Sequence, residues 1–253
     1  MLNGKSIAVV IPAYNEALLI HKTIQSIPAF VDIICVVDDA STDGTASSVA
    51  QLHDPRMHLV THVENQGVGA AIITGYRTCD QLGADVIAVM AGDAQMDPDD
   101  LVNVVSPVVH DTADYCKGDR LSWKGVHRVM PSLRFFGNHI LSILTRLTSG
   151  YPHIRDSQCG YTAISRQVLS RMNLTRIYTR YGFPNDILAH LYTVQGRVAQ
   201  VTVRPIYAAE VSGISLYTAF VKVPLVLLRS LHYRLRNRPS RQDVTTSASA
   251  EQA

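Results

Sequence analysis

Four short apolar runs without polar alternation lie in the first half of the chain, at residues 6–11, 32–37, 57–61 and 86–90. Runs of this kind predict strands that are covered on both faces. The segments between them predict helices and cover residues 17–27, 43–52 and 68–82. Ser41 or Thr42 is expected to be the N-cap of the second helix. Strands that alternate with helices form right-handed βαβ units, so we expect an α/β fold with a Rossmann-like, mostly parallel central sheet flanked by helices.

The second half of the chain shows a less regular pattern. Its predicted elements are a short strand at 115–117, helices at 133–148 and 186–194, and a late strand at 198–203. Residues 1–213 are expected to form one domain, and residues 214–238 a basic amphipathic helical segment. From Pro239 onward the chain contains too few apolar side chains to bury a core, which predicts a disordered tail at 239–253.

Composition argues against several classes of protein. The hydrophobic fraction of 47% is enough for a sizeable core, and the formal net charge of +2 gives no support to a nucleic-acid partner. The four cysteines form no CxxC pair and lack zinc-finger spacing, which favours reduced, mostly buried thiols. No apolar signal-peptide core follows Met1, so we expect a cytoplasmic protein.

Acidic side chains recur where the predicted strands end. Glu16 follows the first strand, Asp38 and Asp39 end the second, and Asp93 follows the fourth. Each acid alone is more simply interpreted as a helix cap or part of a solvated loop. The carboxyl ends of parallel strands, however, meet at one edge of a sheet, and ligands bind there. Together these acids favour a cation over a bare phosphate, so a nucleotide diphosphate would enter as a metal chelate.

The stretch after the fourth strand contains two hard oxygen donors, Asp93 and Gln95, two residues apart. In an extended chain both side chains project to the same side. Such a pair suits Mg²⁺ or Mn²⁺ that keeps bound waters and is completed by phosphate oxygens. Asp38 or Asp39 could accept hydrogen bonds from a base or a ribose. No GxxxxGK(S/T) loop is present, and Gly67-Val68-Gly69 does not complete GxGxxG, so a dinucleotide fold is the weaker interpretation.

Four motifs follow one another along the chain: Val-Ile-Pro-Ala-Tyr-Asn-Glu at 10–16, Asp-Asp-Ala-Ser-Thr-Asp-Gly-Thr at 38–45, Asn-Gln-Gly-Val-Gly-Ala-Ala at 65–71 and Gly-Asp-Ala-Gln-Met-Asp-Pro at 92–98. The series resembles the family-two glycosyltransferases, and is most similar to dolichyl-phosphate mannose synthases and bacterial polyprenyl-phosphate glycosyltransferases. The resemblance extends to about Gly213. It implies a GT-A fold and inverting transfer of a sugar with a divalent metal.

The resemblance also implies roles for individual residues. The positions that match the family's nucleotide pocket are Pro12, Tyr14, Glu16 and Asp39. Asp93 and Gln95 match the last two members of the family's Asp-x-Asp-x-Gln metal motif, whereas Ala91 stands at the first position. The metal ligands are thus retained, while one donor contact is weakened.

Further matches concern the acceptor. Gly118-Asp119-Arg120 matches the family's Gly-Ser-Arg, and Arg134 lies where relatives carry a second arginine for the lipid phosphate. The segment 156–161 resembles Asp-x-x-x-Gly-Phe near the reacting centre, and 210–213 stands where relatives have Arg-x-x-Gly-x-Ser-Lys, here without the lysine. From the residues alone, Arg120 and Arg134 could grip a phosphate bidentately or form surface salt bridges. Asp156 could act as a general base or orient a substrate hydroxyl.

The segment 215–238 carries independent information about a partner. Lys222, Arg229 and Arg236 recur every seven residues and share one helical face. The apolar side chains roughly opposite them are Phe220, Val223, Leu227 and Leu231. This pattern favours attachment to an anionic membrane surface, because the apolar run is shorter than the ~20 residues that span a bilayer. The competing interpretation is a helix that packs on the protein's own core.

The sequence therefore predicts transfer of a hexose from a GDP- or UDP-sugar to a polyprenyl phosphate by a peripheral protein on the cytoplasmic face of a membrane. Asp93 and Gln95 would bind the metal, whereas Arg120, Arg134 and Asp156 would act on the acceptor. One alternative is a transferase with a saccharide or another non-lipid acceptor. The other is a non-catalytic nucleotide-sugar binding protein that lost its activity with the first acid of the metal motif.

Overall fold

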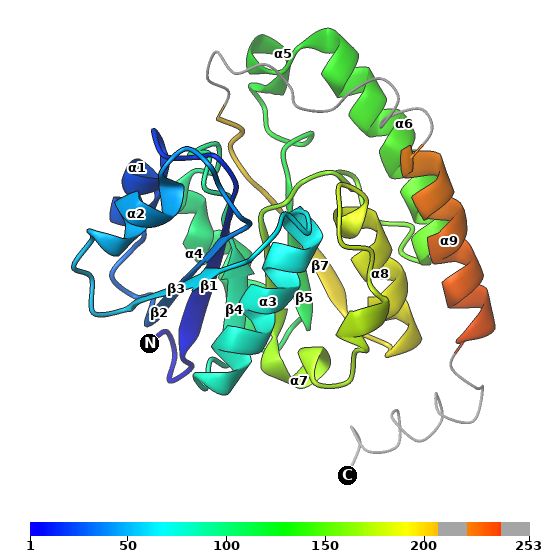
Figure 1. Cartoon of the computed structure of the whole chain (residues 1–253). Helices are drawn as coiled ribbons and strands as arrows, with labels where there is room; N and C mark the ends of the chain where they lie inside the picture. Colours follow the sequence, from blue (N-terminus) through cyan, green and yellow to red (C-terminus); the bar gives the residue numbers. More distant parts are fainter. Residues whose placement is uncertain (207–221, 239–253) are drawn as a thin grey trace.

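The computed structural model describes residues 1–206 and 222–238, in which one central sheet lies between two layers of helices (Figure 1). The sheet has seven strands in the order β3-β2-β1-β4-β6-β5-β7. Their bounds are β1 Ile7–Ala13, β2 Ile33–Asp38, β3 Met57–Thr61, β4 Val86–Val89, β5 Tyr115–Asp119, β6 Thr162–Ser165 and β7 Val198–Thr202. Neighbouring strands are parallel except at β6, which runs antiparallel to β4 and β5. The predicted α/β fold with a mostly parallel sheet is confirmed.

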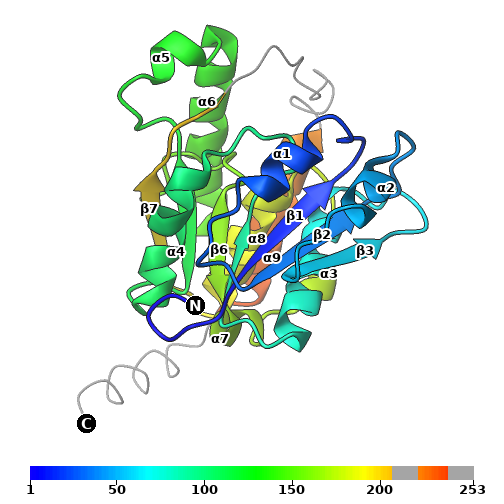
Figure 2. The same ribbon diagram turned by 90° about the vertical axis from the view of Figure 1, so that its left-hand side faces the viewer.

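Helices cover both faces of the sheet (Figures 1 and 2). They are α1 Ile20–Gln25, α2 Thr45–Ala50, α3 Val68–Gln81, η1 Pro98–Asp100, α4 Leu101–Val109, α5 Val126–Val129, α6 Ser132–Ser149, α7 Arg166–Leu169, η2 Leu174–Arg176, α8 Phe183–Thr193 and α9 Val223–Arg236, where η marks a 3-10 helix. Tyr76 of α3 and Ile187 of α8 lie in the hydrophobic core on one face. Ile24 of α1 and Val104 of α4 lie in the core on the other face. Burial on both sides explains why β1, β2 and β4 show no polar alternation. The prediction that both faces are covered is wrong for β3, an edge strand whose residues are partly or fully exposed.

The first two helices begin three and two residues later than predicted. The expectation that Ser41 or Thr42 caps α2 is wrong, because Gly44 occupies the N-cap position with φ +90°. Ser41 Oγ instead accepts the backbone N–H of Asn15 at 2.9 Å, and Thr42 donates its own N–H to Asn15 Oδ1 at 2.9 Å. The polar side chains that suggest a cap therefore join the loop after β2 to the loop after β1.

Strand β6 has no counterpart among the predicted elements, because its sequence Thr-Ala-Ile-Ser is neither a continuous apolar run nor an alternating one. Thr162, its first residue, pairs with Val89 at the end of β4 and with Lys117 near the end of β5. The antiparallel direction of β6 thus carries the preceding segment, residues 156–161, to the C-terminal edge of the parallel strands. That edge is also where the acids after β1, β2 and β4 lie.

Helix α9 packs against α6 and α8 (Figure 1). Val223 and Leu227, which the sequence pattern assigns to a membrane-facing side, are only 5% and 3% exposed. Arg229, one of the three predicted lipid-facing cations, places its Nη1 atom 3.2 Å from Asp186 Oδ2. The predicted direction of the apolar side of α9 is therefore wrong, because that side packs on the protein. Within residues 1–206 and 222–238, no helix is long and apolar enough to cross a membrane.

Several predicted features lie outside the described residues. They are Phe220 of the apolar pattern, the motif at 210–213, the domain boundary after residue 213, and the tail from Pro239.

Candidate active site

The loops that follow β1, β2 and β4 carry the predicted donor residues, and all three contain a strained residue. Asn15, Ala40 and Ala94 have φ values of +58°, +60° and +54°. Residues with a side chain rarely adopt this left-handed conformation, and holding one there costs about 1–3 kcal/mol. Such strain concentrates at functional sites. Three of the six left-handed residues other than glycine in the described chain lie in these loops, where Tyr14 is also 48% exposed. This concentration is consistent with the predicted location of the site.

Hydrogen bonds and close packing join these loops to one another. The backbone N–H of Glu16 donates to Thr45 Oγ1 at 2.8 Å, and the N–H of Gly92 donates to the Pro12 carbonyl oxygen at 3.3 Å. A Cβ atom on Gly92 would lie 3.5 Å from Glu16 Cγ, so the Glu16 side chain lies against the β4 loop. The fold thus brings Pro12 and Glu16 next to the segment that contains Asp93.

The two adjacent acids at the end of β2 have different surroundings. Asp39 Oδ1 lies 2.7 Å from His62 Nδ1 and accepts the Gln66 N–H at 2.9 Å, while Oδ2 accepts the Gly67 N–H at 2.8 Å. Both Asp39 oxygens therefore bind the protein's own loop. Asp38 Oδ1 is buried and has no hydrogen-bond partner among the described residues. A buried acceptor in this state costs about 1–3 kcal/mol, so the geometry favours Asp38 over Asp39 as the acceptor for a base or ribose.

Asp93 and Gln95 are neighbours through a turn. Asp93 Oδ1 accepts the backbone N–H of Gln95 at 3.0 Å, and Ala94 between them is left-handed. The prediction of an extended segment is wrong at this point, because the chain reverses within a few residues of β4 to enter the helix that Pro98 opens. The Asp93 side chain is thus held against the Gln95 backbone by a hydrogen bond within a turn, and not by the alternation of a strand.

The donor chemistry of this turn fits a hard divalent cation. A carboxylate oxygen and an amide oxygen are the ligands that Mg²⁺ prefers, and one or two protein ligands suffice where substrate phosphates and waters supply the rest. In the part of the chain that the structure describes, no group of three His, Cys, Asp or Glu side chains could hold a cation. These residues therefore suit a cation that is bound together with a diphosphate, and Ala91 contributes no oxygen ligand from its side chain.

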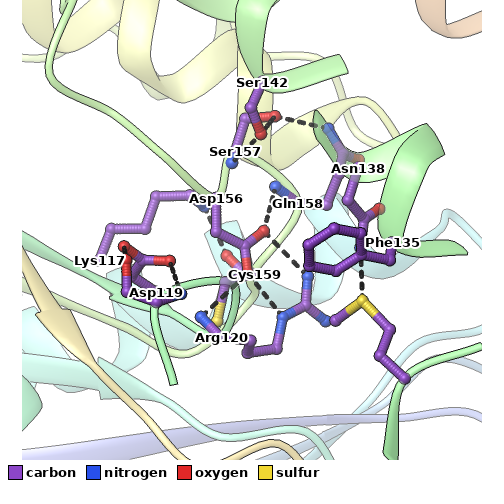
Figure 3. Close-up of polar contacts among 12 residues, drawn as sticks. Lys117, Asp119, Arg120, Phe135, Asn138, Ser142, Asp156, Ser157, Gln158 and Cys159 are labelled. Carbon is purple, nitrogen blue, oxygen red and sulfur yellow. Dashed lines mark hydrogen bonds and ion pairs between the residues drawn. The ribbon is translucent and has the colours of Figure 1, made fainter. Parts of the chain in front are cut away.

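A buried ion pair joins two of the predicted acceptor residues, Arg120 and Asp156 (Figure 3). Arg120 donates from Nε to Asp156 Oδ2 at 2.8 Å and from Nη2 to Oδ1 at 3.0 Å. The same carboxylate accepts the backbone N–H groups of Arg120 at 3.2 Å and of Gln158 at 3.1 Å. The Asp156 side chain is 0% exposed, so these four hydrogen bonds replace its contact with water.

This pairing gives Asp156 a chemistry unlike that of a general base. Burial by itself raises the pKa of the carboxyl group, but the charge and hydrogen bonds of Arg120, aided by the charge of Lys117, outweigh burial and lower the pKa below its usual value. A carboxylate in this state holds a proton poorly. The geometry favours a positioning role, in which Asp156 fixes the plane of the Arg120 guanidinium.

Lys117 is a site residue that the sequence motifs do not indicate. Its side chain is fully buried, and Nζ donates to the backbone oxygen of Cys159, in the loop that contains Asp156 (Figure 3). Burial lowers the pKa of Lys117 to about 8, although the charge of Asp156 acts in the opposite direction. One signal in the sequence points to it, because Lys117 lies in a short predicted strand, where lysine is a disfavoured residue.

The buried lysine predicts an unusual dependence of stability on pH. Because the folded pKa of about 8 lies below the ordinary 10.5, the unfolded chain binds the proton more tightly between these values. Stability of the wild type should therefore rise with pH across this window, relative to Lys117→Met, by about 3 kcal/mol in total. Urea unfolding of both proteins from pH 7 to pH 10.5 measures the difference, and parallel curves would contradict the assignment.

Helix α6 carries Arg134 in its first turn, where the side chain is partly buried. The helix is tied to the loop of Asp156, because Ser142 Oγ accepts the backbone N–H of Ser157 at 3.0 Å. The structure thus places Arg120 and Asp156 in direct contact and carries Arg134 on an element that is hydrogen-bonded to the same loop.

Comparison with known proteins shows the family to which the chain belongs. The profile of Glycosyl transferase family 2 matches residues 8–172, which include every predicted site residue. The UDP-N-acetylglucosamine–dolichyl-phosphate N-acetylglucosaminyltransferase of Methanococcus voltae is 30% identical over 218 residues, or 80% of this chain and 86% of that relative. The polyprenol monophosphomannose synthase of Mycolicibacterium smegmatis is 29% identical over 85% of this chain and 84% of its own.

Solved structures show the same fold. A crystal structure of glucosyl-3-phosphoglycerate synthase from Mycobacterium tuberculosis, in complex with Mn²⁺, UDP and glucosyl-3-phosphoglycerate, matches with a TM-score of 0.67 at 20% identity. The match covers 94% of this chain and 82% of that one, and it confirms the GT-A fold. With the family profile spanning the whole predicted site, the chain belongs to glycosyl transferase family 2 and is a nucleotide-sugar-dependent glycosyltransferase.

Proposed function

We propose that this glycosyltransferase moves a hexose from a GDP- or UDP-sugar to a polyprenyl phosphate, with inversion at the anomeric carbon and with Mg²⁺ or Mn²⁺ bound. The observation that carries the proposal is the similarity to two relatives whose names specify a dolichyl or polyprenol acceptor, over at least 80% of each chain. The family match at residues 8–172 includes the residues proposed for the acceptor as well as those proposed for the donor.

On the donor side, Asp93 and Gln95 are the residues that would hold the cation. A bound divalent cation neutralises the charge that grows on the leaving diphosphate. Asp38, with its buried unpaired oxygen, accepts a hydrogen bond from the base or ribose. The exposed ring of Tyr14 and the Glu16 side chain line the same edge of the sheet. These residues position the diphosphate so that the anomeric carbon faces the acceptor half of the site.

On the acceptor side, Arg120 and Arg134 orient the phosphate for in-line attack. Asp156 holds the Arg120 guanidinium in one plane through its two side-chain hydrogen bonds, so little rotamer entropy is lost when the phosphate binds. A phosphate monoester is already an anion near neutral pH. Its oxygen therefore attacks without a general base, in agreement with the lowered pKa of Asp156.

A polyprenyl acceptor is held in a lipid bilayer, so the enzyme must work at a membrane surface. We expect peripheral attachment to the cytoplasmic face, where each basic residue near anionic lipid contributes about 1 kcal/mol.

The direct test supplies the purified protein with a panel of labelled GDP- and UDP-hexoses, Mg²⁺ and a short-chain polyprenyl phosphate. The expected product is a lipid-linked sugar, and its NMR coupling constants show whether the anomeric configuration is inverted. Transfer to an added saccharide instead would replace the proposed acceptor. Nucleotide-sugar binding without transfer or hydrolysis would favour a non-catalytic protein.

The proposed acceptor arginines predict a selective kinetic defect. Arg134→Ala should raise the acceptor KM or lower kcat/KM for the acceptor by ~10- to 100-fold, the loss expected for a charge-assisted hydrogen bond. Nucleotide affinity, measured by calorimetry, should change little. Arg77→Ala on helix α3 is a matched control, because that arginine is exposed and is more than 40 residues from Arg120 and Arg134 in the sequence. A collapse of nucleotide binding in Arg134→Ala would assign the residue to the donor site or to the fold.

A further inference from the structure

Helix α6 is inverted relative to an ordinary surface helix. The residues that it buries are all polar: Asn138, Ser142, Thr145 and Ser149. The large side chains that it exposes are all apolar: Leu133 at 82%, Leu147 at 67%, Phe136 at 65%, Ile140 at 59%, Ile143 at 52% and Leu144 at 39%. A helix on the surface of a protein surrounded by water shows the opposite distribution, with its apolar stripe toward the core. Contiguous exposed apolar surface of this kind marks a site of interaction.

The inward direction of the polar side is fixed by specific hydrogen bonds. Ser142 Oγ accepts the backbone N–H of Ser157 at 3.0 Å. Thr145 Oγ1 donates to Asn185 Oδ1 at 3.0 Å. Turning the helix to bury its apolar side would break these bonds and leave Asn185 without this donor. The exposed stripe is therefore a built feature of the fold.

Helix α9 packs beside α6 (Figure 1) and also exposes apolar side chains. Its inner side is buried against the protein, and Ser230 Oγ donates to Asp186 Oδ1 at 2.6 Å. Its outer side exposes Leu225 at 60%, Leu228 at 61% and Leu235 at 47%. The two neighbouring helices thus present outward-facing leucines, isoleucines and a phenylalanine, which we call the α6–α9 surface.

The two chain segments that contain the α6–α9 surface carry positively charged side chains and no acidic ones. Residues 120–155 contain six Lys or Arg and no Asp or Glu, and residues 222–238 contain five Lys or Arg and no Asp or Glu. The exposed cations of these two segments include Lys124, Arg128, Lys222, Arg236 and Arg238. An apolar surface whose own two segments carry cations and no acids is complementary to a bilayer with anionic headgroups. It is poorly suited to pairing with a second copy of itself, because a two-fold interface would place like charges together.

We propose that the α6–α9 surface is where this protein docks on an anionic bilayer. The reason for such docking, access to a lipid acceptor, rests on the proposed function. The structural evidence for the surface does not depend on it. It also replaces the predicted membrane-facing side of α9, whose Val223 and Leu227 face the core, with Leu225, Leu228 and Leu235. Arg134 follows Leu133 at the start of α6, so docking on this surface holds the proposed acceptor arginine at the depth of the lipid phosphates.

Co-sedimentation with vesicles tests the surface without any substrate. Wild-type protein should bind phosphatidylcholine vesicles that contain 40% phosphatidylglycerol more strongly than pure phosphatidylcholine vesicles, and binding should weaken as salt is raised. The double substitution Phe136→Ser and Ile140→Ser should reduce partitioning at least ~10-fold, the loss expected when two apolar side chains no longer enter the interface. The matched control replaces Leu82 at the C-cap of α3 and Val102 of α4, which are 42% and 39% exposed, with Ser and should bind as the wild type does.

A fluorescent label shows whether the contact is direct. All four native cysteines are buried, so Ile140→Cys can be labelled selectively with an environment-sensitive dye. Its emission should shift to the blue on adding anionic vesicles, whereas the same dye at Leu82→Cys should not respond. Emission that is already blue-shifted without vesicles would mean that protein covers Ile140, through a second copy or another segment, and would overturn the proposal. So would equal vesicle binding by the wild type and the Phe136/Ile140 variant.

The assay also separates this inference from the proposed function. The Phe136→Ser, Ile140→Ser variant should still transfer sugar to a short-chain polyprenyl phosphate that is soluble in water, but should lose transfer to a long-chain acceptor embedded in vesicles. Absence of transfer by the wild type to either acceptor, with vesicle binding intact, would refute the proposed reaction and leave the docking surface standing.

Discussion

Replacing Asp93 with alanine is expected to lower kcat by at least ~100-fold, the scale seen when a major electrostatic stabiliser is lost. The residue has two functions in the proposed site. Its carboxylate is a ligand for the cation, and its Oδ1 atom accepts the N–H of Gln95 at 3.0 Å and so shapes the turn that orients the second ligand. Transfer rates measured over a range of Mg²⁺ and Mn²⁺ concentrations check the expectation, and removal of the metal with EDTA should have a similar effect.

Two further variants make this experiment specific. Asp93→Asn keeps an oxygen that can accept the Gln95 N–H but removes the charge, so a comparable loss assigns the effect to cation binding rather than to the turn. Asp99→Ala changes an exposed acid only six residues away and should have little effect. Full transfer in EDTA, or by Asp93→Ala, would contradict the metal assignment.

Asp156→Ala is expected to destabilise the folded protein by about 3–5 kcal/mol, because it leaves buried cationic groups without their counter-charge. The groups concerned are Lys117, whose side chain is fully buried, and Arg120, whose side chain is 21% exposed. Denaturant unfolding at pH 7 measures the loss. The double variant Asp156→Asn with Lys117→Met should be less destabilised than the sum of the two single changes, since it removes both the acid and one of its cations.

A surface pair provides the matched control for this experiment. Asp80 and Arg166 make an ion pair of 2.8 Å between Oδ1 and Nε, but their side chains are 43% and 50% exposed. Asp80→Ala should therefore cost no more than about 1 kcal/mol. A similarly small loss for Asp156→Ala would show that the Arg120 pair does not hold the site together.

The sequence was sufficient to predict that the proposed donor residues lie near one another, but not their detailed geometry. Parallel strands that alternate with helices place their carboxyl ends at one edge, so Glu16, Asp38 and Asp93 had to lie in neighbouring loops. Which of Asp38 and Asp39 is better placed to accept a hydrogen bond from a base or ribose depended on partners distant in sequence. Asp39 is occupied by the loop after β3, and no local pattern in the sequence records that contact.

The arrangement of the proposed acceptor residues depended more strongly on tertiary structure. Strand β6 shows neither an apolar run nor polar alternation, yet its antiparallel direction is what brings Asp156 to Arg120. The contact joins residues 36 positions apart, and it changes the chemistry of the acid by lowering its pKa. Lys117 gains its unusual environment in the same way, from a loop that is distant in sequence.

The amphipathic helices show most clearly what the sequence decides and what the tertiary structure decides. The sequence by itself determined that α6 and the C-terminal segment have one apolar and one polar side, because that periodicity follows from the geometry of a helix. It could not determine which side faces the protein. In α6 the polar side is buried, because Ser157 and Asn185 from other elements offer it hydrogen-bond partners. In α9 an apolar side is buried, because Ser230 and Arg229 bind Asp186 of α8 and so orient the helix. The orientation of a helix is a property of its neighbours, and only the tertiary structure supplies them.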